Sequence, residues 1–418
     1  MVFDLLSTTS RVEVPFITVD IAGYTFGVWN RKNGKFNGTS RWNYPNFMKS
    51  MTISKVNGQV NTYKIQMVYP IQAGDDPNML DKVFSASASN NPLGSRKIKI
   101  SYGDLAVPSF TYKEEIAFMD KVTSSIDINS STITYNISCI SQALTLTAGD
   151  HDFPQRKAKP SSVIIELLQD KSFGMQEVFS GMTDMLKVMK NNLIATDDRE
   201  VVIPQKTNIK VFDYLNFLVN CMEAKEDLGE DAFSKHKYTI VTYDDITGIM
   251  GGPYFKVSKL SKNVQQTNSL DVYEVDVGYP NNVVTSFTVQ DDETYSIYYD
   301  FQEKINFPDN VYRINDQGKI DTVYSPTLAR SPRLYKTTPA EKTWWSYVTN
   351  YPIKASMEIR GLLRPAMLMQ YLKVNVLFYG REHISSGYYV VSAQNDTISE
   401  SGFKTNLSLI RLPLGENK

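Results

Sequence analysis

The sequence has few of the residues on which catalytic and metal-binding sites depend. Its 418 residues include three histidines and two cysteines. The histidines, His151, His236 and His383, lie far apart in the chain, whereas a zinc site or a Ser-His-Asp triad needs groups that converge. The sequence therefore predicts no metal, no cofactor and a protein that is not an enzyme.

Signals for secretion and membrane insertion are also missing. Cys139 and Cys221 stand far apart in apolar surroundings, which predicts buried free thiols rather than a disulfide. The N-terminus has no basic segment followed by a long apolar one, so no signal peptide is expected. The most apolar stretch, residues 362–378, is interrupted by Arg364, Pro365 and Lys373. We expect synthesis in a cytoplasm and no membrane insertion.

An excess of charge of one sign is absent as well. Forty-four basic and 45 acidic side chains give a net charge of −1, so no global field favours nucleic acid or an anionic membrane. Adjacent carboxylates point away from each other, whereas a glycosidase needs two that face one cleft. Five adjacent acid pairs are therefore interpreted as turn formers: Asp75-Asp76, Glu114-Glu115, Asp197-Asp198, Asp244-Asp245 and Asp291-Asp292.

What the sequence does contain is a β-strand pattern. Twenty-five tyrosines and 20 phenylalanines favour pleated, half-buried structure. Asn57-Gly58 is a strong hairpin turn signal between two alternating segments, residues 48–56 and 60–69. Similar alternation predicts strands in residues 12–28, 97–102, 113–122 and 131–146, with a turn at 124–130. Residues 1–148 are thus predicted to form an antiparallel β-domain, with one short helix after Asp76.

The middle of the chain changes period. Residues 149–160 are interpreted as a linker from their composition. Helical spacing then predicts helices at 161–168, capped by Ser161-Ser162, at 176–190 and at 211–222. We expect residues 149–236 to form a helical or α/β domain. Residues 237–350 are expected to form a β-rich insert, with strands at 238–243, 254–260, 273–279, 283–290 and 294–299 and an extended connection at 304–343.

Two adjacent tryptophans near the end of this insert suggest an interface. Successive side chains of an extended segment point to opposite faces, so Trp344 and Trp345 cannot both enter one core. One of them is therefore a candidate contact with a partner chain. Packing of each tryptophan within its own domain is the alternative.

The last sixty residues hold the most specific pattern. Residues 386–391 read Ser-Gly-Tyr-Tyr-Val-Val, and residues 402–411 form an alternating strand. Its apolar face is Phe403, Thr405, Leu407 and Leu409, and Lys404, Asn406 and Ser408 lie on the other face. Residues 351–418 are expected to supply the closing strands of a sheet.

These two segments resemble the tail hub proteins of contractile-tailed phages, the T4-type baseplate hub family, and the related spikes of type VI secretion. That family pairs a Ser-Gly-x-Tyr-x-Val strand with a Gly-[Phe/Tyr]-x-Thr-x-Leu-x-Leu-x-Arg strand. The chain departs from it at Pro365-Ala366, where members often have Pro-Gly. The matching residues are Ser386, Gly387, Tyr389 and Val391, then Gly402, Phe403, Thr405, Leu407, Leu409 and Arg411.

The resemblance implies a mainly β fold with an α+β middle: two tube-like antiparallel β-barrels plus a helical or mixed insert. Residues 1–148 would form the first barrel, and residues 351–418 would close a discontinuous second one. It also implies a homotrimeric ring, without cofactor, that adapts a hexameric tail tube to a trimeric central spike. Its partners would be the spike, the tube and other baseplate proteins of a virion tail assembled in the host cytoplasm, with DNA in transit through its channel.

Two functions from other classes stay open at this point. A receptor- or carbohydrate-binding tail-tip protein could use aromatic loops such as residues 295–301. A cell-wall hydrolase is the second, and the missing acid/base constellation counts against it.

Overall fold

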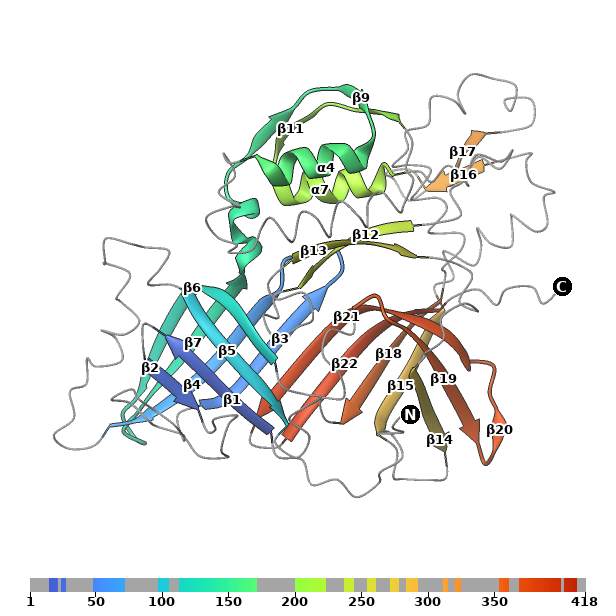
Figure 1. Ribbon diagram of the computed structural model, residues 1–418. Coiled ribbons are helices and arrows are strands. Elements are labelled where there is room, and N and C mark those ends of the chain that lie inside the picture. Colours follow the sequence, from blue (N-terminus) through green and yellow to red (C-terminus); the bar gives the residue numbers. More distant parts are fainter. Residues whose placement is uncertain are drawn as a thin grey trace.

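The computed structural model describes residues 15–21, 24–27, 48–71, 97–104, 113–170, 200–222, 237–243, 254–260, 271–277, 283–291, 311–314, 320–324, 353–360, 368–399 and 402–411. These residues are mainly β-strands, and fourteen of the strands join in one sheet (Figure 1). The predicted mainly β class is confirmed. The sheet curls around two separate apolar cores, one for each half of the sheet.

The first half of the sheet is antiparallel and comes from the N-terminal third of the chain. Its spatial order is β3-β4-β7-β6-β5-β1-β2. The predicted hairpin at Asn57-Gly58 is confirmed, and Gly58 has a φ of +72°, a conformation that suits glycine in a hairpin turn. The strands are β1 (Pro15–Ile21), β2 (Tyr24–Gly27), β3 (Met48–Val56), β4 (Thr62–Pro70), β5 (Lys97–Asp104), β6 (Lys113–Asp127) and β7 (Thr132–Ser141).

Strands β6 and β7 extend beyond the core and form a projecting arm. The predicted turn at 124–130 is wrong in its first half, because β6 and β7 stay paired up to Asp127 and Thr132. Ser and Thr are common in turns, but the ladder hydrogen bonds of the backbone form without apolar side chains. Every residue from 120 to 131 except Val122 is exposed. We call residues 120–131 the β6–β7 arm.

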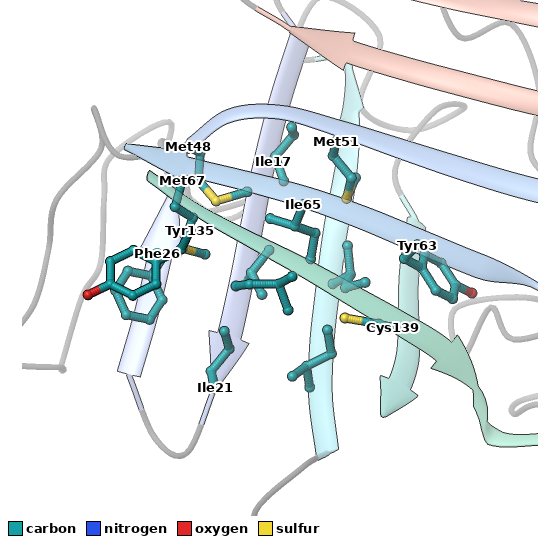
Figure 2. Packing of buried hydrophobic residues seen from close by; sticks show 14 of the residues in the cluster. Ile17, Ile21, Phe26, Met48, Met51, Tyr63, Ile65, Met67, Tyr135 and Cys139 are labelled. Atoms are coloured by element: carbon teal, nitrogen blue, oxygen red, sulfur yellow. The ribbon is translucent and has the colours of Figure 1, made fainter. Parts of the chain in front are cut away.

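The first core lies inside the curled first half. Inward and outward positions alternate along the strands, so β4, and β3 from Met51 onward, bury every second side chain. Figure 2 shows how these side chains meet, and it labels Ile17, Ile21, Phe26, Met48, Met51, Tyr63, Ile65, Met67, Tyr135 and Cys139. The predicted strand at 131–146 ends at Ser141, where a 3-10 helix, η3 (Gln142–Thr147), begins.

The second half of the sheet surrounds the second core. Its order is β14-β19-β21-β22-β18-β15, with the short β20 beside β19, and β14 and β15 contact each other at the far edges. β14 and β15 come from the predicted insert and pair with strands of the C-terminal segment. The strands are β14 (Asp271–Val277), β15 (Val284–Asp291), β18 (Ile353–Arg360), β19 (Tyr371–Phe378), β20 (Arg381–Glu382), β21 (Gly387–Ser399) and β22 (Gly402–Arg411).

One strand pair departs from the antiparallel arrangement that the resemblance implies. β14 and β19 are parallel, from Asp271 opposite Leu372 to Val277 opposite Phe378. A parallel pair cannot be joined by a tight turn. The long connection between these strands, which contains β15 and β18, makes the parallel pairing possible.

A third body packs η3, two helices and two small two-stranded sheets around its own core. The helix predicted at 211–222 is confirmed as α7, and α4 confirms the one at 161–168, although Pro160 occupies its first turn and Lys159, not Ser161-Ser162, is its N-cap. The linker prediction for 149–160 is wrong, because these residues pair as β8 and β9. The elements are β8 (His151–Phe153), β9 (Arg156–Ala158), α4 (Pro160–Gln169), β10 (Val201–Ile203), β11 (Lys206–Ile209) and α7 (Val211–Asn220).

Two further antiparallel pairs complete the described structure. The strands predicted at 238–243 and 254–260 are confirmed as β12 (Lys237–Tyr243) and β13 (Tyr254–Leu260), which pair with each other. β16 (Val311–Ile314) pairs with β17 (Ile320–Tyr324) inside the segment predicted as an extended connection. The helices predicted after Asp76 and at 176–190, the strand at 294–299, and Trp344 and Trp345 lie outside the described residues. Within the described ranges, neither helix has the length and hydropathy needed to cross a bilayer.

Candidate functional site

The hairpin of β21 and β22, which carries the sequence motif, runs from one core to the other (Figure 1). Near its turn, Ile398 and Phe403 pack in the first core. Nearer its base, the motif residues that enter the second core are Tyr389, Val391, Leu407 and Leu409. The hairpin is therefore a structural element that both halves of the sheet share.

A β-bulge lets β21 serve both cores. Its beginning pairs with β19, and from Ala393 onward it pairs with β3. The register against β22 shifts between Val391 and Ala393, so Ser392 is an extra residue. An extra residue reverses the alternation of side chains. Tyr389 and Val391 therefore face the second core, whereas Gln394 and Asp396 point into the first half of the sheet.

A buried polar cluster lies just beyond this bulge. Gln394 and Asp396 are fully buried, and Gln394 Nε2 donates hydrogen bonds of 3.0 and 2.8 Å to the two Asp396 carboxylate oxygens. Thr405 Oγ1 donates a third, of 2.7 Å, to Asp396 Oδ1. A buried carboxylate is costly unless hydrogen bonds satisfy it. The motif residue Thr405 thus holds Asp396 in place at the junction of the two cores.

A buried ion pair adjoins that cluster. Lys55 of β3 stands directly opposite Gln394 and forms an ion pair with Glu115. The Glu115 carboxylate also accepts hydrogen bonds from Tyr63 Oη at 2.6 Å and from Tyr102 Oη at 2.7 Å. The interpretation of Glu114-Glu115 as turn formers is wrong. Both lie within β6, where alternation turns one carboxylate inward and the other out.

The base of the hairpin is fastened by the remaining motif residues. Arg411 Nη2 donates to the carbonyl oxygens of Ile384 at 2.8 Å and Ser386 at 3.0 Å. Ser386 Oγ accepts from Val376 N at 2.9 Å and donates to Val376 O at 3.2 Å. A Cβ added to Gly387 would lie 3.2 Å from Arg411 Nε, so glycine leaves room for the guanidinium.

Two more motif residues have local roles. Tyr389 Oη donates a 2.6 Å hydrogen bond to the Ser385 carbonyl, and burial raises the pKa of this phenol, which keeps it a donor. Gly402 begins β22 with a φ of +118°, a backbone conformation that other residues rarely adopt. All ten motif residues are thus placed in or beside one hairpin.

The Asn57-Gly58 turn contacts both halves of the sheet and the helical body. Asn57 N donates to the carbonyl of Ser392, the bulge residue, at 3.0 Å. Asn57 Nδ2 contacts Met369 Sδ at 2.9 Å on the second half of the sheet. From α7, Asn216 Nδ2 donates to Gly58 O at 2.8 Å. One turn therefore links both halves of the sheet and the helical body.

We predict that Asn216→Ala loosens the helical body from this turn. Losing the hydrogen bond to Gly58 O should lower the free energy of unfolding by about 1 kcal/mol. Hydrogen exchange of the backbone amides in residues 56–60 should become faster. Asn220→Ala, at the end of the same helix, is the control, and equal exchange in the two variants would contradict the prediction.

Sequence reasoning missed several of the residues that hold these junctions. Lys55 could have been found, because it follows Met51 and Ile53 on the inward face of β3. Gln394 and Asp396 could not, because the bulge reverses the alternation that Tyr389 and Val391 establish. In the described part of the chain, no group of three or more His, Cys, Asp or Glu side chains is placed to hold a metal ion.

Comparison with known proteins gives structural matches without sequence relatives. No protein-family model and no curated protein matches the chain. A tail protein from Neisseria meningitidis matches with a TM-score of 0.48 and 8% identity, over 95% of this chain and 96% of that one. A tail protein of prophage MuSo2 from Shewanella oneidensis gives 0.49 and 11%, over 95% and 97%.

A component of the type VI secretion system of E. coli gives a TM-score of 0.43 and 7% identity, over 88% of this chain and 74% of that one. That protein is itself described as structurally similar to T4 bacteriophage tail proteins. All three solved structures have TM-scores below 0.5 and sequence identities of 11% or less.

Proposed function

We propose that this protein is a structural, non-enzymatic hub in the baseplate of a contractile phage tail or a related injection machine. The observation that carries the proposal is the shared hairpin of β21 and β22. It joins the two curled halves of the sheet into one continuous wall of strands. Three copies would place six such sheets around an axis. That arrangement would match a hexameric tail tube on one side and a trimeric central spike on the other, with DNA passing through the channel.

The way the chain uses its buried polar groups supports a structural role. Glu115 is bound by Lys55 and two tyrosines, and Asp396 is bound by Gln394 and Thr405. Both carboxylates therefore hold strands together at the junction between the halves of the sheet. A hub whose wall of strands must keep one shape within an assembly needs strands that are fixed to each other in this way.

The experiment that tests the proposal is light scattering of the purified protein, alone and mixed with its candidate spike partner. A trimeric hub alone should have a mass of about three times 47.4 kDa, and a trimer formed in the mixture should exceed that mass by that of the bound spike. Negative-stain images should then show a ring with a central opening. A monomer under both conditions would contradict the proposal, and screens for glycan binding and peptidoglycan hydrolysis would follow.

A further inference from the structure

The face of the sheet that points away from the two cores is polar across both halves. Six neighbouring strands contribute to it, in the order β18-β22-β21-β3-β4-β7 (Figure 1). Side chains alternate along each strand, so the residues between the core positions point to this face. Many of them carry hydroxyl or amide groups, for example Ser54, Thr62, Asn136, Asn395 and Asn406. We call this surface the polar face.

The strand register places three basic side chains of the polar face in one row. Arg360 of β18 lies directly opposite Lys404 of β22, and Thr397 of β21 follows Lys404. Thr52 of β3 and then Lys64 of β4 continue the row. Arg360 and Lys64 are exposed, and the Lys404 side chain is 58% exposed. Neighbouring strands lie about 4.8 Å apart, so four steps give a row roughly 19 Å long that spans both halves of the sheet. We call Arg360, Lys404 and Lys64 the basic row.

Few acidic side chains offset this charge. On the described outward positions of the six strands, Glu358 is the one carboxylate, and Lys404 Nζ lies 3.4 Å from its Oε1. Within the described residues, no carboxylate is paired with Arg360 or Lys64. The next strand, β6, adds no net charge, because residues 120–121 are an aspartate and a lysine. The polar face therefore has an excess of positive charge in a chain whose net charge is −1.

One contact in the row is unfavourable for the protein by itself. Arg360 and Lys404 are like charges on directly opposite positions of two paired strands, an arrangement that destabilises a sheet. Glu358 relieves only the Lys404 side of this repulsion. An anion above the pair would be attracted by both cations, so its binding would replace a repulsion by two attractions. This pair is therefore a second observation, besides the excess charge, that favours an anionic partner.

We propose that the polar face contacts the phosphate backbone of duplex DNA through the basic row. Arginine, lysine, hydroxyl and amide side chains are the groups that bind phosphates without reading the base sequence. An acidic protein is the weaker candidate, because the centre of a protein interface is apolar and poor in charge. The large apolar side chains that the described structure exposes lie elsewhere, in the β6–β7 arm, β10, β14 and the region of β19 and β20.

The inference rests on the proposed hub and names the face of its wall that lines the DNA channel. Three phosphate contacts bind weakly, and binding that does not depend on sequence lets a protein slide along DNA. A short basic row would therefore guide the duplex past the hub, whereas a strongly basic lining would retain it.

Fluorescence anisotropy of a labelled, mixed-sequence DNA duplex, titrated with the full chain over a series of salt concentrations, tests the contact. The triple variant Arg360→Gln, Lys404→Gln, Lys64→Gln should bind at least about tenfold more weakly at low salt. The slope of log K against log salt concentration should become shallower by about 2.7, since each lost phosphate contact removes about 0.9. Each single variant should change the slope by about 0.9.

The matched control removes the same charge from the helical body. Lys157→Gln, Lys159→Gln, Lys210→Gln changes three exposed lysines outside the polar face, so this variant should keep the affinity and the salt slope of the parent protein. Thermal melting shows whether a variant is folded. Arg360→Gln should melt no lower than the parent protein, because it removes the repulsion between Arg360 and Lys404.

The outcomes separate this inference from the proposed function, which light scattering tests independently. Weaker binding and a shallower salt slope in the basic-row variants alone support the inference. Equal losses in the control show an effect of total charge and overturn it. Polyglutamate that binds as tightly as DNA at equal charge assigns the face to an acidic protein and also overturns it. A trimer that binds no DNA overturns the inference and leaves the hub proposal standing, whereas a monomer that binds no DNA overturns both.

Discussion

Replacing Glu115 with leucine while Lys55 remains is expected to lower the free energy of unfolding by about 3–5 kcal/mol. The Lys55 side chain is almost completely buried, so the substitution leaves an ammonium group inside the protein without its countercharge. Tyr63 and Tyr102 lose their acceptor at the same time. The shift should appear in the midpoint of urea denaturation.

The double variant Glu115→Leu with Lys55→Met separates charge burial from packing. Apolar side chains of similar volume often replace a buried ion pair at little cost, so the double variant should recover most of the lost stability. The control is Glu114→Gln, which breaks the partly exposed pair with Lys99 on the other face of β6 and should cost less than about 1 kcal/mol. Equal effects of Glu115→Leu and Glu114→Gln would contradict this account.

Deleting Ser392 is expected to abolish the native fold or destabilise it by more than about 4 kcal/mol. Without the bulge, β21 keeps one alternation along its whole length. If Tyr389 and Val391 stay in the second core, Asp396 and Ile398 must turn out of the first half of the sheet.

Circular dichroism melting and limited proteolysis would measure this loss. The matched control is Ser392→Ala, which keeps the bulge and removes the hydrogen bond from Ser392 Oγ to the Ser408 carbonyl. That variant should melt within a few degrees of the parent protein. A deletion variant with the melting temperature of Ser392→Ala would show that the bulge is dispensable.

The parts of the fold that could be predicted from the sequence are those set by local pattern. The Asn57-Gly58 hairpin, helix α7 and the alternating face of β22 depend on residues close together in the chain. The same holds for the motif residues, which all lie within the last 33 positions of the chain and meet in one hairpin.

The parts that could not be predicted depend on distant partners. Nothing near Gly387 indicates that β21 pairs first with β19 and then with β3, and nothing local shows the bulge at Ser392. The sequence predicts that this strand ends at residue 122, yet the neighbouring β7 satisfies the backbone of β6 as far as Asp127. Residues 149–160 became strands because β10 and β11 supply partners from beyond α4.

The pairing of β3 with the end of the chain has a consequence for synthesis. Asn57 and Met369, which meet at this junction, are 312 positions apart in the sequence. A ribosome therefore releases β3 with one edge open, and that edge stays open until the much later β21 emerges. The first core also lacks Ile398 and Phe403 until then. Neither half of the sheet is complete without β21 and β22, so the shared hairpin couples the folding of the two halves.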